Sequence, residues 1–236
     1  MSGAESALKA RLREHANAED GVFLQRFFKT GPGDYGEGDV FIGVRVPAIR
    51  QVASTARDTT LATMARLLGS RVHEDRALAL VLMVRAFAAG EEAARRDIYE
   101  LYLANTRFIN NWDLVDLSAA PIVGGWLSMR SRAPLARLAR SASLWERRIA
   151  IVATHQFIRQ GEYDVTFQIA DRLIRDPHDL IHKAVGWMLR EVGKRDGEAL
   201  RTYLRDRLQA LPRTALRYAI ERFPEDERLR YLRGTP

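Results

Sequence analysis

The sequence predicts an all-α protein, and three observations carry this prediction. Apolar residues recur at the three- and four-residue spacing of amphipathic helices along most of the 236 residues. Glycine, proline, asparagine or aspartate separates these segments at short intervals. Helix pairs follow one another at about 35 to 40 residues, the period of a HEAT-like helical-repeat solenoid. A compact helical bundle is the alternative. No linker divides the chain, so we expect one domain over residues 1–236.

The helices are expected in the following places. A first helix is centred on Leu8 and Leu12, and a second runs from Phe23 to Lys29. Further apolar patterns cover Leu78 to Ala88 (ended by Gly90), Trp145 to near Gly161, Asp179 to Gly193, and Arg201 to Leu208. Each pattern is a single apolar stripe, so each helix must be buried against its neighbours.

One segment, residues 31–46, departs from the helical pattern. The glycine density of Gly31–Gly38 opposes a helix, and the Val/Phe/Ile run of Asp39–Val46 favours an extended strand or hairpin. Three of its glycines form a G-x-G-x-x-G string, but the strand before it and the helix after it that a dinucleotide site requires are missing. Two interpretations stay open: a plain surface turn, or a loop that contacts a DNA strand through Gly33, Tyr35 and Gly36.

Composition restricts the function classes. The net charge is +7, and four of the 37 basic residues are lysine, which leaves 33 arginines. Arginine binds phosphate bidentately and stacks on aromatic rings, so nucleic acid is an expected partner, although a GC-rich genome has the same compositional effect. The absence of cysteine excludes disulfides, thiol nucleophiles and the usual structural zinc sites.

The remaining compositional features suggest a soluble cytoplasmic protein without a metal or cofactor. The charged first twenty residues do not resemble a signal peptide, and no apolar run approaches the length of a membrane span. His178 and His182 lie one helical turn apart, but no third ligand accompanies them, so we expect no zinc site there.

Trp112 and Asp116 are the residues that most suggest chemistry. Four residues apart, they would share one face of a helix, where an aromatic ring beside a carboxylate suits a cationic ligand. Arg148 and Trp187 stand further along the chain in similarly aromatic and basic segments. The structural alternative is a core role for each tryptophan, a capping role for the aspartate and a solvated surface position for Arg148.

Taken together, these segments resemble the AlkD family of alkylpurine DNA glycosylases, which are built from HEAT-like repeats. The resemblance extends from about Phe41 to Arg217. Its anchors are Phe41–Pro47 with Arg50, Asn111–Asp116, Trp145–Ala150, Lys183–Glu191 and Pro212–Ala219.

The resemblance implies a role for each matching position. Asp116 corresponds to the catalytic aspartate, and Trp112 and Trp187 to the two aromatic walls of the lesion site. Residues that bind the DNA backbone are expected at Arg148, Lys183 and Arg190. The family further implies a concave basic face that grips duplex DNA, and a lesion that stays stacked and needs no pocket.

The implied function is hydrolysis of the N-glycosidic bond of cationic N3- or N7-alkylated purines, with Asp116 stabilising the oxocarbenium-like transition state. No lysine is placed as a Schiff-base nucleophile, so the expected enzyme is a monofunctional glycosylase and a monomer that works on the nucleoid. The insertion at 31–46 is an argument for a related activity, binding of branched (four-way) DNA without catalysis. A HEAT-type protein scaffold is a further alternative.

Overall fold

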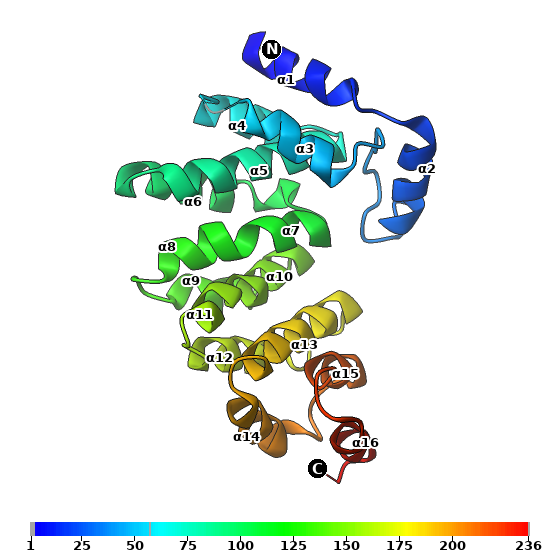
Figure 1. Ribbon diagram of the computed structural model, residues 1–236, viewed down its shortest axis with the longest axis vertical. Coiled ribbons are helices and arrows are strands. Elements are labelled where there is room, and N and C mark those ends of the chain that lie inside the picture. The colour runs from blue at the N-terminus through cyan, green and yellow to red at the C-terminus, as the bar shows by residue number, and fades with distance from the viewer. Residues whose placement is uncertain (1–2, 57, 236) are drawn as a thin grey trace. The chain divides into compact units, whose positions relative to one another are not determined.

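The computed structural model describes residues 3–56 and 58–235 (Figure 1). Within these ranges every regular element is helical, and the single β-bridge, between Val40 and Val72, is isolated and parallel. The all-α prediction is therefore confirmed. The described residues include no helix with the length and apolarity of a membrane span.

The chain forms two compact units, residues 1–122 and 123–236. The prediction of one domain from 1 to 236 concerns whether these units fold independently, and it stays a prediction. The helices of the first unit are α1 (Gly3–Arg13), α2 (Ala18–Phe27), α3 (Val46–Ser54), α4 (Leu61–Leu68), α5 (His73–Ala89), α6 (Glu92–Ala104), the 3₁₀ turn η1 (Thr106–Phe108) and α7 (Trp112–Ser118).

Helix α5 is the centre of the first unit. It packs against α3, α4, α6 and α7, and its Leu78, Leu80 and Met83 are fully buried. Successive helices therefore share one apolar core, as expected of a helical-repeat fold. The first turn of α5 is different, because it buries the polar sequence His73–Arg76.

The second unit is centred on α13. A π-helix, η2 (Ala119–Gly124), leads into it. Its helices are α8 (Gly125–Leu127), α9 (Ala133–Leu138), α10 (Leu144–Ala153), α11 (His155–Arg159), α12 (Asp164–Leu173), α13 (Asp179–Gly193), α14 (Gly197–Arg207), α15 (Arg213–Ala219) and α16 (Glu225–Arg233). Helix α13 packs on α10, α12, α14 and α15. Gly186 allows the close approach to α15, because a Cβ at this position would lie 2.4 Å from the Ala215 carbonyl oxygen.

Helix positions agree well with the periodicity, and the ends differ locally. Helix α13 has the expected bounds, and α5 ends before Gly90 as expected. The segment from Trp145 to Gly161 is divided in two at Thr154, whose hydroxyl donates to the Ile151 carbonyl at 2.6 Å. Helix α14 begins earlier than expected because Asp196 caps it, accepting from the Ala199 N–H at 2.9 Å.

Residues 31–46 form a non-helical loop up to the start of α3 at Val46, as predicted, whereas the alternative of a strand or hairpin in this segment is wrong. Residues 31–38 are turns and bends. After them the backbone N–H groups of Ile42, Gly43 and Val44 donate to the Glu74 carboxylate at 3.1, 2.8 and 3.2 Å. A side chain thus satisfies the donors that a neighbouring strand would otherwise engage.

Candidate functional site

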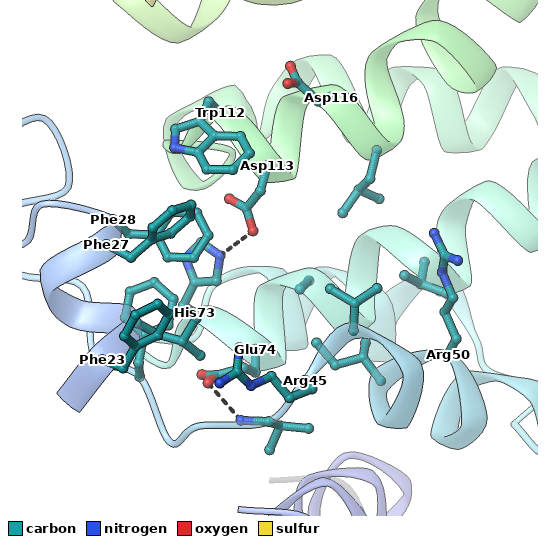
Figure 2. A pocket seen from close by; sticks show the side chains of 18 residues that line it. Phe23, Phe27, Phe28, Arg45, Arg50, His73, Glu74, Trp112, Asp113 and Asp116 are labelled. Carbon is teal, nitrogen blue, oxygen red and sulfur yellow. Dashed lines mark hydrogen bonds and ion pairs between the residues drawn. The ribbon is translucent and has the colours of Figure 1, made fainter. Parts of the chain in front are cut away.

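A cavity of about 450 Å³ lies in the first unit, between α2, α3, α5 and α7 (Figure 2). Its lining combines aromatic rings with charged side chains. The aromatic and charged lining residues are Phe23, Phe27, Phe28, Phe41, Trp112, Arg45, Arg50, His73, Glu74, Asp113 and Asp116. The volume is in the range of ligand sites, about 300 to 1,000 Å³.

The aromatic wall has a buried part and an open part. Phe28 is buried and stacks on both Phe41 and Trp112, with ring centroids 5.1 Å apart in each pair. Phe27 meets the edge of Trp112 at 5.8 Å and stacks with Phe23 at 6.0 Å. Phe23 and Phe27 are 54% and 52% exposed. The buried stack around Phe28 therefore supports the exposed rings of Phe23 and Phe27.

The structure brings Trp112 and Asp116 to the same cavity. The Asn111 side chain caps α7 by accepting the Trp112 N–H at 2.8 Å, which starts the helix at the tryptophan. One turn later Asp116 also lines the cavity, and in Figure 2 it stands at the edge of the site with its carboxylate directed away from the phenylalanine rings. Both side chains are half-buried. The prediction that they share a helix face is confirmed, and their roles stay predictions.

Behind the rings runs a chain of four charged groups that sequence reasoning missed. Arg76 donates to Asp39 Oδ1 at 2.7 Å, and Asp39 Oδ2 lies 3.1 Å from His73 Nδ1. His73 Nε2 lies 2.8 Å from Asp113 Oδ2, a contact visible in Figure 2. The available signal was the polar sequence His73–Arg76 at the start of an otherwise apolar helix.

The charges in this chain stabilise one another. Burial opposes protonation of His73, but the Asp113 and Asp39 carboxylates outweigh it and raise the pKa of the imidazole. Burial likewise opposes ionisation of Asp39, but His73 and Arg76 outweigh it and lower the pKa of that carboxyl. The His73 ring, in contact with both carboxylates, holds Asp113 in place. The other carboxylate oxygen of Asp113, Oδ1, is buried without a hydrogen-bond partner among the described residues.

Two arginines near the cavity, Arg50 and Arg85, have no protein partner among the described residues. Arg50 on α3 borders both the aromatic cavity and an adjoining hollow of about 270 Å³, which Arg85 on α5 also lines. Both side chains are exposed, and neither guanidinium is bonded to any residue that the structure describes. By contrast, Arg45 is ion-paired with Asp20, its Nε donating at 2.9 Å. One guanidinium at the cavity, that of Arg50, and one in the adjoining hollow, that of Arg85, are thus available to an anion.

The backbone-binding residues expected in the second unit are engaged within the protein. Arg148 is 5% exposed and donates to the Leu180 carbonyl at 2.6 Å. Lys183 pairs with Asp179 at 2.8 Å, and Arg190 pairs with Glu221. The surface alternative for Arg148 is wrong, since the residue links α10 to α13. Whether these three cations bind phosphate stays a prediction.

Trp187 lies half-buried on α13, with its ring centroid 6.3 Å from that of His155. The two nearby histidines, His178 and His182, have structural roles. His178 caps α13 by accepting the Leu180 N–H at 3.1 Å, and His182 donates to the Asp176 carbonyl at 2.5 Å. A separate hollow of about 620 Å³ in this unit has acidic residues in its lining and is unsuited to phosphate; these residues are Asp164, Asp171, Asp196, Glu198 and Asp206.

The glycine-rich loop has one open side and one closed side. Gly33 has a φ of +81°, its N–H donates to Glu37 at 2.9 Å, and the space around it is open. Gly36 is buried and donates to the Lys29 carbonyl at 3.1 Å, and a Cβ there would lie 2.6 Å from the Phe28 carbonyl oxygen. Tyr35 is half-buried. Part of the loop therefore folds back against the end of α2, and its contact with DNA stays a prediction.

Both the sequence and the fold of the chain are similar to those of known proteins. A family profile described as DNA alkylation repair enzyme matches residues 8–223. A solved structure described as a predicted DNA alkylation repair enzyme from Enterococcus faecalis has a TM-score of 0.68 and 15% sequence identity, covering 89% of this chain and 98% of that one. At this identity the likeness shows a shared fold. No curated protein sequence matches the chain.

Proposed function

The chain belongs to the DNA alkylation repair enzyme family, and from this premise we propose that it is a monofunctional glycosylase that removes cationic N3- or N7-alkylated purines from duplex DNA. The observation that carries the proposal is the position of Asp116, which lines an aromatic cavity one helical turn from Trp112. A carboxylate beside aromatic faces suits a reaction in which positive charge develops on the sugar.

The chemistry requires little beyond that carboxylate. The alkylated base already carries a positive charge, so it leaves without being protonated, and water completes the hydrolysis. At about 4 Å and an effective dielectric near 20, one carboxylate stabilises a unit positive charge by roughly 4 kcal/mol. That energy corresponds to a rate increase of about a thousandfold.

DNA is the partner of this reaction, and the net charge of +7 favours it. In this proposal Trp187 on α13 is a further residue that contacts the lesion. Lys183 and Arg190 exchange their carboxylate partners for phosphates when DNA binds. Arg148 acts differently, because its bond to the Leu180 carbonyl fixes the start of α13. No cofactor or metal enters the mechanism, and we expect a monomer.

The experiment is single-turnover release of base from a duplex with one N7-methylguanine, with wild type and Asp116→Asn side by side. We expect release by wild type and a loss of about a thousandfold in Asp116→Asn, with DNA binding retained. Equal release by both proteins would contradict the role of Asp116. If neither protein releases base although both bind DNA, binding of branched DNA becomes the better proposal. The folded-back loop that replaces the expected hairpin argues against that alternative.

A further inference from the structure

Glu191 on α13 is a buried carboxylate that the reaction proposed above does not use. It is 8% exposed, and the Lys194 ammonium donates to its Oε1 at 2.6 Å. Two further basic groups lie near its Oε2, the Arg195 guanidinium at 3.6 Å and His155 Nε2 at 3.9 Å. A carboxylate is removed from water only where partners compensate for the lost hydration. This cluster joins α11 to α13 at the turn that follows Trp187.

Trp187 lies one helical turn before Glu191 on the same helix. Helical side chains lean toward the N-terminus, so the carboxylate at i+4 lies over the turn that carries the indole ring. The ring also borders His155, with ring centroids 6.3 Å apart and planes inclined at 38°. His155 therefore lies beside both residues, which places Trp187 and Glu191 in one cluster of side chains.

The polar atom of the Trp187 ring is its Nε1–H, and a half-buried indole requires an acceptor for this donor. Glu191 suits the role because it is charged. Burial opposes ionisation of its carboxyl, but Lys194, His155 and Trp187 outweigh burial and lower the pKa of Glu191. A charged acceptor forms a stronger hydrogen bond than a neutral one, so the carboxylate can hold the indole firmly.

The backbone under the ring is fixed independently of Glu191. Gly186, the residue before Trp187, packs so closely on α15 that a Cβ there would lie 2.4 Å from the Ala215 carbonyl oxygen. The remaining freedom of the ring is rotation about its two side-chain torsions. A hydrogen bond at Nε1 restricts both of these torsions.

We infer that Glu191 is a positioning residue that fixes the orientation of the Trp187 ring by accepting the indole N–H. The inference rests on the proposed function, in which Trp187 contacts the lesion. An aromatic ring attracts positive charge with its face and not with its edge, so its orientation matters to a cationic transition state. A ring that is fixed before DNA binds does not have to be immobilised in the complex. Glu191 itself touches neither the lesion nor the sugar.

The orientation is tested by NMR on the ¹⁵N-labelled full chain, which contains four tryptophans. Trp187→Phe identifies the indole N–H signal of Trp187. Glu191→Ala should shift this signal and speed its exchange with water by about threefold or more, because the donor loses its acceptor. Glu191→Gln should restore most of the wild-type behaviour, since an amide oxygen also accepts a hydrogen bond.

Lys194→Met is the matched control for the loss of the ion pair. It removes the closest ionic partner of Glu191 among the described residues and leaves the carboxylate in place. The Trp187 signal should then keep its position. An unchanged signal in Glu191→Ala, or an equal shift in Lys194→Met, would overturn the inference. Thermal unfolding confirms that each variant is folded.

Base release from the N7-methylguanine duplex tests the consequence for the reaction. Glu191→Ala should slow single-turnover release by about three- to tenfold, the range for freeing one side chain, and leave affinity for undamaged duplex unchanged. In a Trp187→Phe background, which has no indole N–H, Glu191→Ala should cause no further loss. Losses that multiply in the double variant would show that Glu191 acts by another route, and the inference would fall.

Two outcomes separate this inference from the proposed function. If wild type releases no base while the indole signal responds to Glu191→Ala as expected, the excision proposal falls and the support of Trp187 by Glu191 stands. If wild type releases base and the indole signal does not respond to Glu191→Ala, the inference falls while the glycosylase stands.

Discussion

The aromatic cavity of the first unit and the α13 surface of the second differ in whether their charged groups are available. Both contain residues that a short sequence motif singles out, Trp112 with Asp116 in one and Trp187 with its neighbouring cations in the other. In the first, the motif pair lines a cavity that Arg50 also lines, and Arg50 has no hydrogen-bond or ion-pair partner among the described residues. In the second, Arg148, Lys183 and Arg190 each hold a protein partner. A motif identifies the type and position of a side chain, whereas its tertiary partners decide its availability.

The largest effect on stability is expected at Glu74, which lines the cavity. Its carboxylate accepts three backbone N–H groups and is 2% exposed. Glu74→Ala would leave those donors unsatisfied, and we expect a loss of about 3 to 5 kcal/mol in the free energy of unfolding. Urea denaturation measures it. A loss below about 1 kcal/mol would mean that the Ile42–Val44 backbone has other partners available.

The next effect separates a structural from a DNA-binding role for Arg148. Because the buried Arg148 guanidinium donates to the Leu180 carbonyl, Arg148→Met should lower the free energy of unfolding by about 2 kcal/mol. Affinity for undamaged duplex, measured by fluorescence anisotropy on the folded variant, should change little. Unchanged stability with a flattened salt dependence would instead assign Arg148 to the phosphates, as the family resemblance implies.

The contacts of His73 with Asp39 and Asp113 predict that the stability of the first unit depends on pH. The pKa of His73 is raised above its unfolded value, so its contribution to stability is fully present below about pH 6.5 and is lost as pH rises through the higher folded value. The stability difference between wild type and His73→Gln should therefore shrink as the solution becomes more alkaline. NMR titration of the His73 ring checks the direction directly. A ring that loses its proton below pH 6.5 would contradict it.

The smallest effect concerns the ion pairs of the second unit. Glu221→Gln removes the partner of Arg190, and an exposed pair contributes at most about 1 kcal/mol. If Arg190 binds phosphate, DNA affinity should rise, by about fivefold at most. Glu225→Gln, which alters an exposed acidic residue on α16 that has no hydrogen-bond or ion-pair partner among the described residues, controls for the change in net charge. Equal gains in both variants would leave Arg190 with a purely structural role.

Sequence reasoning found what depends on local spacing. The bounds of α13 follow from periodicity and capping, and the common placement of Trp112 and Asp116 follows from their separation by one helical turn. These are short-range properties of a helix, so a single sequence contains them.

What was missed depends on contacts between distant segments. His73 contacts Asp39 and Asp113, which are 34 and 40 residues away in the sequence, and no local sequence pattern predicts such pairs. The hairpin prediction failed for the same reason, because Glu74 lies about thirty residues from the backbone that it binds. The open state of Arg50 and Arg85 is likewise visible only when their surroundings are known.

The glycine-rich loop also has a position where a reporter group can be attached. Its Gly33 side is open, whereas Gly36 is closely packed, so a reporter group attached near Pro32 would leave the contacts of Gly36 with the end of α2 intact. The chain contains no cysteine, and Pro32→Cys therefore creates a single labelling position without further editing of the sequence. A spin label or fluorophore at that position could follow the loop in real time while the protein searches DNA.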